Sequence, residues 1–458
     1  MEQFDYLIIG TGQATGTLLG KLIPTGKKIA VIEGHKVGGS CVNYGCTPTK
    51  TLVASARAFQ MANSGADYGF TAEPTLDFSK VRQRMNAVRN ESNKGLSQWL
   101  EESENVELIR GWGQFAGPRQ VRVGNRQLAA DYIIINVGAK HTAPPIKGLD
   151  QTPYLDSEGI LDLSELPQKL LIVGGGYIGL EFAQVFRRFG SAVTVIQRGA
   201  QLMPQEDEDI AASIQEKLEE EGVEVLLNTE SQAVSASAEG EIITTLSRQG
   251  EKLERRGSHL LIATGRKPAT QRLNLAQAGI ETDGKGFIKT DDFGQTNVER
   301  VFALGDVNGK GAFTHTSVND AEVLLDHIFG GSRRISQRIP VYALFSDPPL
   351  GRVGLSEKEA LAQGYQVLKA TMPMAKISRA KEMGETHGLA KLLVDAKTDL
   401  ILGAAIHGPG GDEIINMFAA IMHSGITCKK YREVVLVHPT VSELMPFMLD
   451  HLKPVEAE

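Results

Sequence analysis

The chain has 458 residues and a formal net charge of −7, and 41% of its residues are hydrophobic. This length corresponds to about three domains, and the composition is typical of a globular α/β enzyme. The acidic balance disfavours binding to nucleic acid or to a membrane surface. No apolar run approaches the roughly 20 residues of a spanning helix, and the N-terminus lacks the charged-then-apolar pattern of a leader. We therefore expect a cytoplasmic protein without nucleic-acid or membrane partners.

The first elements predict a dinucleotide-binding βαβ unit. A strand over residues 4–9 leads into Gly10-Thr11-Gly12, an apolar helix runs to residue 22, and a second strand ends at Glu33. Such glycines let backbone N–H groups approach a pyrophosphate at the helix N-terminus, and an acid about 20 residues later accepts from ribose hydroxyls. The third glycine position of this pattern is occupied by Thr15, so the helix–strand packing must accommodate a side chain there.

Two of the three cysteines, Cys41 and Cys46, follow closely behind a glycine pair. Their spacing differs from the Cys-x-x-Cys spacing of zinc and thioredoxin sites, and we predict no metal. Pro48 and an alanine-rich stretch over 51–58 indicate a helix that begins near Cys46, and a helix N-terminus favours a thiolate. A bridge across one irregular turn is geometrically feasible. Because the sequence has few cysteines and no secretory leader, we interpret the pair as redox-active rather than as a structural disulfide or two idle thiols.

Further along, a polar helix is predicted over 77–100 and strands over 106–137, followed by a linker at Pro144-Pro145. A second strand–glycine–helix pattern starts at residue 170, and it has all three glycines. Two such patterns predict two bound nucleotides, one a flavin and one a nicotinamide. The stretch 260–268 then closes this second domain, and a buried strand over 301–307 delivers Asp306 to a loop. From about residue 339 the sequence predicts mixed strands and helices without a third glycine pattern. The C-terminal part contains His438-Pro-Thr-Val-Ser-Glu443.

In this order along one chain, these motifs resemble the class I pyridine nucleotide–disulfide oxidoreductases, which include glutathione reductase, dihydrolipoamide dehydrogenase and mercuric reductase. The resemblance implies an α/β fold with two Rossmann-like domains, for FAD and NAD(P)H, and a C-terminal α+β dimerisation domain. The implied boundaries are 1–147 and 271–338 for the two parts of the FAD domain, 148–270 for the NAD(P)H domain and 339–458 for the dimerisation domain. The resemblance also implies a homodimer in which the tail histidine reaches the partner's active site.

By the same resemblance, electrons pass from the nicotinamide through the flavin to a Cys41–Cys46 disulfide. Cys46 is then the thiol beside the flavin, and Cys41 is the interchange thiol that meets the substrate. His438 is suited to take the thiol proton, and Glu443 to orient it.

The family pattern also implies a set of cofactor contacts. Lys50 matches the lysine beside the flavin, and Glu181 the glutamate that pairs with it. Tyr177 covers the nicotinamide pocket, and Asp306 binds the flavin's ribityl chain. The implied FAD contacts are Gly10, Gly12, Gln13, Ala14, Glu33, Gly39, Ser40, Lys50, Gly113, Val137, Gly138, Asp306, Phe313 and Thr314. The implied nicotinamide nucleotide contacts are Gly174, Gly176, Tyr177, Ile178, Glu181, Gln197, Arg198, Gly265 and Arg266. We interpret His315 as packing and Cys428 as a bystander, and we assign Tyr44 no role.

The second nucleotide fold favours NADPH over NADH. An acid at position 197 would bind a ribose and repel a 2′-phosphate, but the residue there is the neutral Gln197, and Arg198 can pair with the phosphate. The second phosphate-binding arginine of glutathione reductase would fall near Pro204, so this phosphate clamp is incomplete.

We therefore expect an FAD-dependent NAD(P)H oxidoreductase that delivers electrons through the dithiol to a disulfide-type acceptor, either a small molecule or a small disulfide. The alternative is a mercuric reductase-like enzyme, or another metal-ion or oxidant-stress reductase, that uses the same dithiol. Mercuric reductases carry a vicinal cysteine pair near the C-terminus and a tyrosine at the position of His438, whereas no cysteine follows Cys428 here. A structural flavoprotein would have lost a cysteine, Lys50 or His438, and a transhydrogenase would not need the cysteine pair. The identity of the acceptor stays open.

Overall fold

The computed structural model describes residues 1–455, which divide into two units. The first unit comprises residues 1–51, 82–143 and 265–338. The second comprises residues 52–81, 144–264 and 339 onward. Two long helices contribute residues to both units, α3 (Cys46–Asn63) and α4 (Phe78–Glu102). In the described residues, no helix combines the length and apolar character that a bilayer-spanning segment requires.

A seven-stranded sheet forms the centre of the first unit, in the order β3-β2-β1-β6-β5-β4, with β16 also paired to β6. The strands β1, β2, β3, β6 and β16 pair in parallel, as expected of near-continuous apolar runs that are buried on both faces. The strand bounds are β1 (Glu2–Ile9), β2 (Ile29–Glu33), β3 (Val106–Arg110), β4 (Gln114–Gly117), β5 (Gln120–Val123), β6 (Arg126–Ile135) and β16 (Val301–Ala303).

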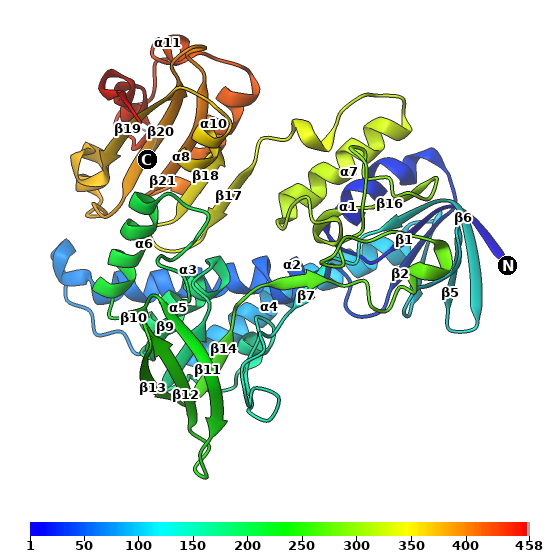
Figure 1. Cartoon of the computed structure of the whole chain (residues 1–458), viewed down its shortest axis with the longest axis horizontal. Coiled ribbons are helices and arrows are strands. Elements are labelled where there is room, and N and C mark those ends of the chain that lie inside the picture. Colours follow the sequence, from blue (N-terminus) through cyan, green and yellow to red (C-terminus); the bar gives the residue numbers. More distant parts are fainter. Residues whose placement is uncertain (456–458) are drawn as a thin grey trace. The chain divides into compact units, whose positions relative to one another are not determined.

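Side chains of β1 alternate between two hydrophobic cores, because successive residues of a strand point to opposite faces. Leu7 and Ile9 belong to the core on one face, and Tyr6 and Ile8 to the core on the other. The second core lies under α1 (Gln13–Leu22) and α7 (Thr314–Ile328), which pack against each other (Figure 1). A two-stranded ribbon of β7 (Ala139–His141) and β15 (Arg266–Pro268) completes this unit, together with the short helix α2 (Gly39–Tyr44).

The second unit contains the other predicted nucleotide fold. Its four-stranded parallel sheet has the order β10-β9-β8-β14, and an antiparallel sheet, β11-β12-β13, shares its hydrophobic core. The helix α5 (Tyr177–Phe189) follows β8, and α6 (Glu208–Glu220) follows β9. The strand bounds are β8 (Lys169–Val173), β9 (Ala192–Ile196), β10 (Glu224–Leu226), β11 (Thr229–Ala236), β12 (Ile242–Arg248), β13 (Glu251–Gly257) and β14 (His259–Ile262).

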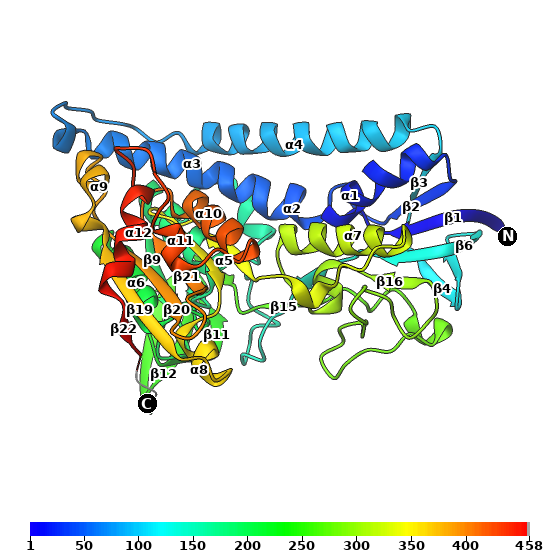
Figure 2. The same ribbon diagram turned by 90° about the horizontal axis from the view of Figure 1, so that it is seen from above.

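A six-stranded sheet in the order β17-β18-β21-β20-β19-β22 forms the rest of the second unit, and all of its pairs are antiparallel. Helix α10 packs on β18 and β21 of this sheet, and Figure 2 shows it beside β21. The bounds are β17 (Val341–Leu344), β18 (Leu350–Gly354), α8 (Glu357–Ala362), β19 (Val367–Pro373), α9 (Ser378–Glu382), β20 (Leu389–Asp395), β21 (Ile401–His407), α10 (Gly411–His423), α11 (Cys428–Tyr431), α12 (Met445–Met448) and β22 (Lys453–Pro454).

This architecture confirms the predicted α/β class, with a glycine turn directly after the first strand of each nucleotide fold. The division into two units does not separate residues 144–264 from those after 338, so the predicted boundaries at 147, 270 and 338 stay predictions.

Candidate active site

The predicted dithiol lies in the first unit, on two consecutive helices. Cys41 belongs to α2, and Cys46 is the first residue of α3, as the sequence predicted. Both are free, partly buried thiols. The Cys46 sulfur lies 3.3 Å from Oγ1 of Thr314, which is the first residue of α7. The N-terminal ends of two helices therefore meet at Cys46, and each favours negative charge there.

The surroundings of the two thiols shift their pKa values in opposite directions. A hydrogen bond from the Cys41 thiol lowers the pKa of Cys46 to about 6, and the Thr314 hydroxyl and the charge of Lys50 act in the same direction. The same hydrogen bond raises the pKa of Cys41, and burial raises it further. At neutral pH the reduced site therefore holds a Cys46 thiolate and a protonated Cys41.

The segment that carries Cys41 is fixed by buried polar contacts. The Asn43 amide is almost fully buried and donates to the carbonyls of Val37 (2.8 Å) and Gly39 (3.0 Å). Gly39 has a φ of +62°, and a Cβ there would lie 3.1 Å from Cα of Gly12. Glycine at position 39 thus brings the redox segment close to the first nucleotide-binding turn.

The first glycine turn fits a dinucleotide. Gly10 has a φ of +95°, and a Cβ there would lie 2.4 Å from the Asn136 carbonyl oxygen. Gly12 is the N-cap of α1 and supplies no capping side chain, so N–H groups of the first turn can face an anion. Glu33 accepts from Thr11 N–H (3.0 Å) and from its hydroxyl (2.5 Å), and its other oxygen accepts from the His35 N–H (2.7 Å). This orients the carboxylate at the position where a ribose is expected.

The threonine at the third glycine position has a local explanation. The Thr15 hydroxyl donates to the Gly10 carbonyl (3.0 Å) and accepts from the Asn136 amide (2.9 Å). The Thr15 side chain therefore connects the glycine turn to the residue that follows β6.

Arg266 was predicted to contact the nicotinamide nucleotide, and the structure places it in the first unit. Its guanidinium pairs with Asp306 (3.3 Å) and donates to the Ser40 hydroxyl (3.2 Å) and the Ala139 carbonyl (2.5 Å). Burial raises the pKa of Asp306, and the nearby Arg266 partly offsets this. Arg266 thus links two predicted FAD residues to each other, and its predicted nucleotide contact stays a prediction.

The remaining predicted FAD residues also belong to the first unit. The Gln13 amide donates to the Gly38 carbonyl (3.2 Å), and Ala14 is buried in α1. The Phe313 ring stacks on His315 with a centroid distance of 5.5 Å. The others in this unit are Lys50, Gly113, Val137 and Gly138.

The second glycine turn, in the second unit, also fits a dinucleotide. Gly176 is the N-cap of α5 and supplies no capping side chain, and no atom lies within 4 Å of the position of its Cβ. A Cβ at Gly174 would lie 2.5 Å from the Ala263 carbonyl oxygen, and one at Gly179 would lie 2.3 Å from the Gly174 carbonyl oxygen. Gly174 and Gly179 therefore have a steric reason, whereas Gly176 leaves open space at the N-cap, and Tyr177 and Ile178 follow as the first residues of α5.

Gln197 is held by the same turn. Its Oε1 accepts from the Gly175 N–H (3.1 Å), and its Nε2 donates to the Gln201 carbonyl (3.1 Å). The exposed Arg198 follows at the end of β9. This strand end therefore presents a neutral amide and a cation.

Two predicted pairs involve the second unit. Glu181 is buried and accepts from the Phe345 N–H (3.0 Å), whereas Lys50 belongs to the other unit, so their pairing stays a prediction. His438 Nδ1 lies 3.0 Å from both carboxylate oxygens of Glu443. Because a carboxylate only accepts, Nδ1 carries the proton and Nε2 is the nitrogen that can exchange one. The two residues line a cavity of about 410 Å³, and the His438 side chain is 78% exposed.

Tyr44 and Cys428 had no catalytic or cofactor role assigned from the sequence. The Tyr44 hydroxyl lies 2.9 Å from Nδ1 of His35. Cys428 is buried in α11, and burial raises its pKa to about 12. The contact of Thr314 with Cys46 was missed, because Thr314 was predicted only as an FAD contact. Its position at the start of α7 was the available signal, since helix N-termini stabilise thiolates.

The chain matches the family described as pyridine nucleotide-disulphide oxidoreductase over residues 4–321, and the dimerisation domain of that family over residues 341–448. It is 36% identical over 453 residues to the probable pyridine nucleotide-disulfide oxidoreductase RclA of Escherichia coli, covering 97% of this chain and 98% of RclA. It is 32% identical over 445 residues to a mercuric reductase of Lysinibacillus sphaericus, with coverages of 96% and 81%. A solved structure described as the Cu(II) complex of HOCl-induced flavoprotein disulfide reductase RclA from Escherichia coli has a TM-score of 0.90 and 35% identity, with coverages of 99% and 100%.

Proposed function

The chain belongs to the pyridine nucleotide-disulphide oxidoreductase family, and from this premise we propose that it reduces a small disulfide through Cys41 and Cys46 with NADPH as the electron donor. FAD and a pyridine nucleotide are the cofactors of the family, and the two glycine turns fit them. The observation that carries the proposal is the differentiation of the dithiol. A thiolate is stabilised at Cys46 by Cys41, Thr314 and Lys50, while Cys41 keeps its proton.

Bound at the first glycine turn, FAD would supply the two electrons, taken from the pyridine nucleotide, that reduce the Cys41–Cys46 disulfide to a Cys46 thiolate and a Cys41 thiol. Cys41 must lose its proton before it can attack, and its raised pKa makes a base necessary. We assign this step to His438 of the partner subunit, because Glu443 holds Nδ1 and leaves Nε2 to accept the proton.

The Cys41 thiolate then attacks one sulfur of the acceptor disulfide and forms a mixed disulfide. The other acceptor sulfur leaves and takes the proton back from the imidazolium. The Cys46 thiolate next attacks the Cys41 sulfur, which closes the Cys41–Cys46 disulfide and releases the second acceptor thiolate. The exchange is therefore balanced, with two electrons moved from the protein to the acceptor.

The preference for NADPH is supported by charge. Gln197 is neutral and its acceptor oxygen is already used by the Gly175 N–H, so this strand end has no carboxylate to repel a 2′-phosphate. Arg198 is exposed beside it and can make a charge-assisted contact with that phosphate.

The matched dimerisation domain supports a homodimer, and we propose that each active site uses residues of both subunits. The exposed His438 is suited to act in a partner's site. Because disulfide reduction belongs to a reducing compartment, we also propose a cytoplasmic location.

A second candidate is a metal-ion reductase that uses the same dithiol. It is favoured by the similarity to mercuric reductases and to the RclA structure that is described as a Cu(II) complex. Reduction of a metal ion leaves no thiolate product to protonate, and a coordinating metal ion itself displaces the thiol proton, so this reaction does not need the His438–Glu443 pair. This pair is the reason to place disulfide reduction first.

The decisive test is an acceptor panel in which NADPH and NADH oxidation are followed with small disulfides, Hg²⁺ and Cu²⁺. We expect turnover with a disulfide, and we expect it to be lost in both Cys41→Ser and His438→Ala. Turnover with a metal ion only, unaffected by His438→Ala, would overturn the proposal in favour of the second candidate.

A further inference from the structure

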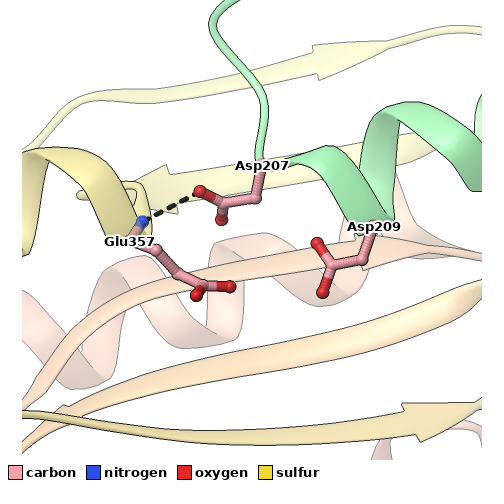
Figure 3. Close-up of side chains that lie close together, drawn as sticks. All are labelled: Asp207, Asp209 and Glu357. Carbon is pink, nitrogen blue, oxygen red and sulfur yellow. Dashed lines mark hydrogen bonds between the residues drawn. The ribbon is translucent and has the colours of Figure 1, made fainter. Parts of the chain in front are cut away.

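A cluster of buried charges lies in the second unit, at the start of α6. Three carboxylates, from Asp207, Asp209 and Glu357, face one another there (Figure 3). The Lys391 ammonium lies 3.0 Å from Asp207 and 2.9 Å from Asp209, and it also contacts Glu357. The cation of this cluster is therefore a lysine of the chain itself, and we do not assign the carboxylates to a metal ion.

A second cation extends the cluster. The Arg352 guanidinium lies 3.1 Å from Asp207 and 3.4 Å from Glu206, and Glu206 also accepts from the Tyr342 hydroxyl. Arg352 and Lys391 are almost completely buried, and so are Glu206 and Asp207. Buried charges persist only when they are paired, so the ends of these four side chains are held in one geometry.

The cluster holds one end of a segment whose other end lies in the nucleotide fold. Glu206 and Asp207 end the segment 197–207, and Arg352, Glu357 and Lys391 come from β18, α8 and β20. The Asp207 carboxylate does not cap α6. It accepts instead from the Glu357 N–H at 2.9 Å, as Figure 3 shows. The segment is thus anchored to elements outside the nucleotide fold.

Hydrogen bonds connect this anchor to the glycine turn. The Gln201 amide donates to the Glu206 carbonyl (2.9 Å), and the Gln201 carbonyl accepts from Gln197 (3.1 Å). Gln197 in turn accepts from the Gly175 N–H (3.1 Å). A second connection runs through Met203, whose N–H donates to the Gly175 carbonyl (2.9 Å) and whose carbonyl accepts from the Glu206 N–H (2.8 Å).

Met203 also has a left-handed backbone, with a φ of +45°. A residue other than glycine adopts this conformation only when its surroundings impose it. The segment 197–207 is therefore held in one defined shape from both ends, and Gln197 and Arg198 lie at the end that the nucleotide is expected to meet.

We propose that Lys391 and Arg352 are positioning residues for the pyridine nucleotide: by neutralising Glu206 and Asp207 they fix the segment that presents Gln197 and Arg198 to the nucleotide's adenosine end. This inference rests on the proposed nucleotide site of the second glycine turn. It assigns to strands of the dimerisation region a role in nucleotide affinity. Substitutions there should change the binding of the nucleotide without changing the chemistry of the dithiol.

The test measures the affinity of the purified holoenzyme for NADP⁺ and NAD⁺ by calorimetry, together with KM and kcat for NADPH. Lys391→Met removes the central cation, and Asp207→Asn removes one buried charge with almost no change in shape. Lys369→Met is the matched control. The Lys369 ammonium lies 3.0 Å from the Glu357 carboxylate, and its side chain is 36% exposed. In the described residues, no ion pair joins Lys369 to Glu206 or Asp207.

We expect Lys391→Met and Asp207→Asn to weaken NADP⁺ binding by about 2- to 30-fold, the range for supporting residues away from a ligand. KM for NADPH should rise with kcat unchanged, the signature of lost binding alone. Lys369→Met should match the wild type. Retention of FAD shows that a variant is folded. If Lys391→Met does not retain FAD, the affinity of Asp207→Asn for NADP⁺ tests the positioning role instead.

Wild-type affinity in Asp207→Asn, or an equal loss in Lys369→Met, would overturn the positioning role. A different result would contradict the proposed function. If the unaltered enzyme binds NAD⁺ better than NADP⁺, the NADPH preference is wrong, and the positioning role is then read from NAD⁺. Because binding is measured without an acceptor, the acceptor panel does not affect this result.

Discussion

The Thr314 hydroxyl oxygen lies 3.3 Å from the Cys46 sulfur, although the two residues are 268 positions apart in the sequence. Thr314 also starts α7, so a hydroxyl and a helix N-terminus act together on one sulfur. Both stabilise a thiolate more than a thiol, which agrees with the lowered pKa of Cys46.

Replacing Thr314 with valine should raise the pKa of Cys46 from about 6 toward its ordinary value. A hydrogen bond to a charged group contributes about 1.5–3 kcal/mol, which corresponds to roughly one to two pKa units. The measurement is the rate of alkylation of Cys46 in the reduced protein as a function of pH, with the modified peptide identified by mass spectrometry. Thr314→Ser keeps the hydroxyl and should behave as the wild type. An unchanged midpoint in Thr314→Val would show that the hydroxyl does not hold the thiolate.

His438→Ala should slow thiol–disulfide exchange by roughly 10²–10⁴-fold, the usual contribution of a general acid–base residue. Reduction of the enzyme by NADPH involves neither His438 nor the acceptor and should stay normal. Rapid mixing of the two half-reactions separately measures both rates.

The geometry of the shared site can be tested with a mixed dimer that carries Cys41→Ser in one subunit and His438→Ala in the other. If sites form between subunits, both lesions fall in one site, and the dimer keeps about half of the wild-type rate by this count. If each site uses its own chain's histidine, no intact site remains, and the measured exchange should collapse.

Arg198→Ala should raise KM for NADPH by about ten- to a hundredfold, because one charge-assisted contact to the 2′-phosphate is lost. KM for NADH should change little, since NADH lacks this phosphate. Steady-state kinetics with both nucleotides provide the comparison, and Arg198→Lys, which keeps the charge, should retain part of the preference. Equal effects on the two nucleotides would contradict the role of Arg198.

The buried His407 should make the stability of the folded protein depend on pH. Burial lowers the pKa of this residue to about 3, and its Nδ1 lies 2.9 Å from the Ser213 hydroxyl. Its pKa in the unfolded chain is about 6.5. The unfolded state therefore binds a proton more readily, so the stabilisation is complete above about pH 6.5 and is lost as the pH falls toward 3.

His407→Asn removes this titration and should flatten the decline of the unfolding temperature between pH 6.5 and 4. The absolute stability of the variant is not the readout, because the substitution also leaves a small cavity. The slope of the thermal midpoint against pH is compared in the two proteins, and identical slopes would rule out His407 as the source.

Much of the fold and part of the site could be predicted because they depend on local patterns. The strand–glycine–helix order predicted both nucleotide folds, since only glycine permits the close backbone approaches found at Gly10 and Gly174. The helix start at Cys46 was likewise predictable from Pro48 and the alanine-rich stretch that follows. The pairing of Glu443 with His438 involves residues five positions apart, within reach of one turn.

The remaining features depend on which distant segments pack together, and only the tertiary structure decided them. The sequence identified Thr15 as a departure from the glycine pattern, but its hydrogen bond with Asn136 depends on where β6 ends. From the sequence, Arg266 was assigned to the nicotinamide nucleotide, and only the pairing of β15 with β7 shows that it lies beside Ser40 and Asp306. Lys391 became the cation of three carboxylates only because the fold brings its side chain, from β20, to Asp207, Asp209 and Glu357. Sequence periodicity indicates that a side chain is buried, whereas the partner that makes a buried charge tolerable is determined by the packing of the whole chain.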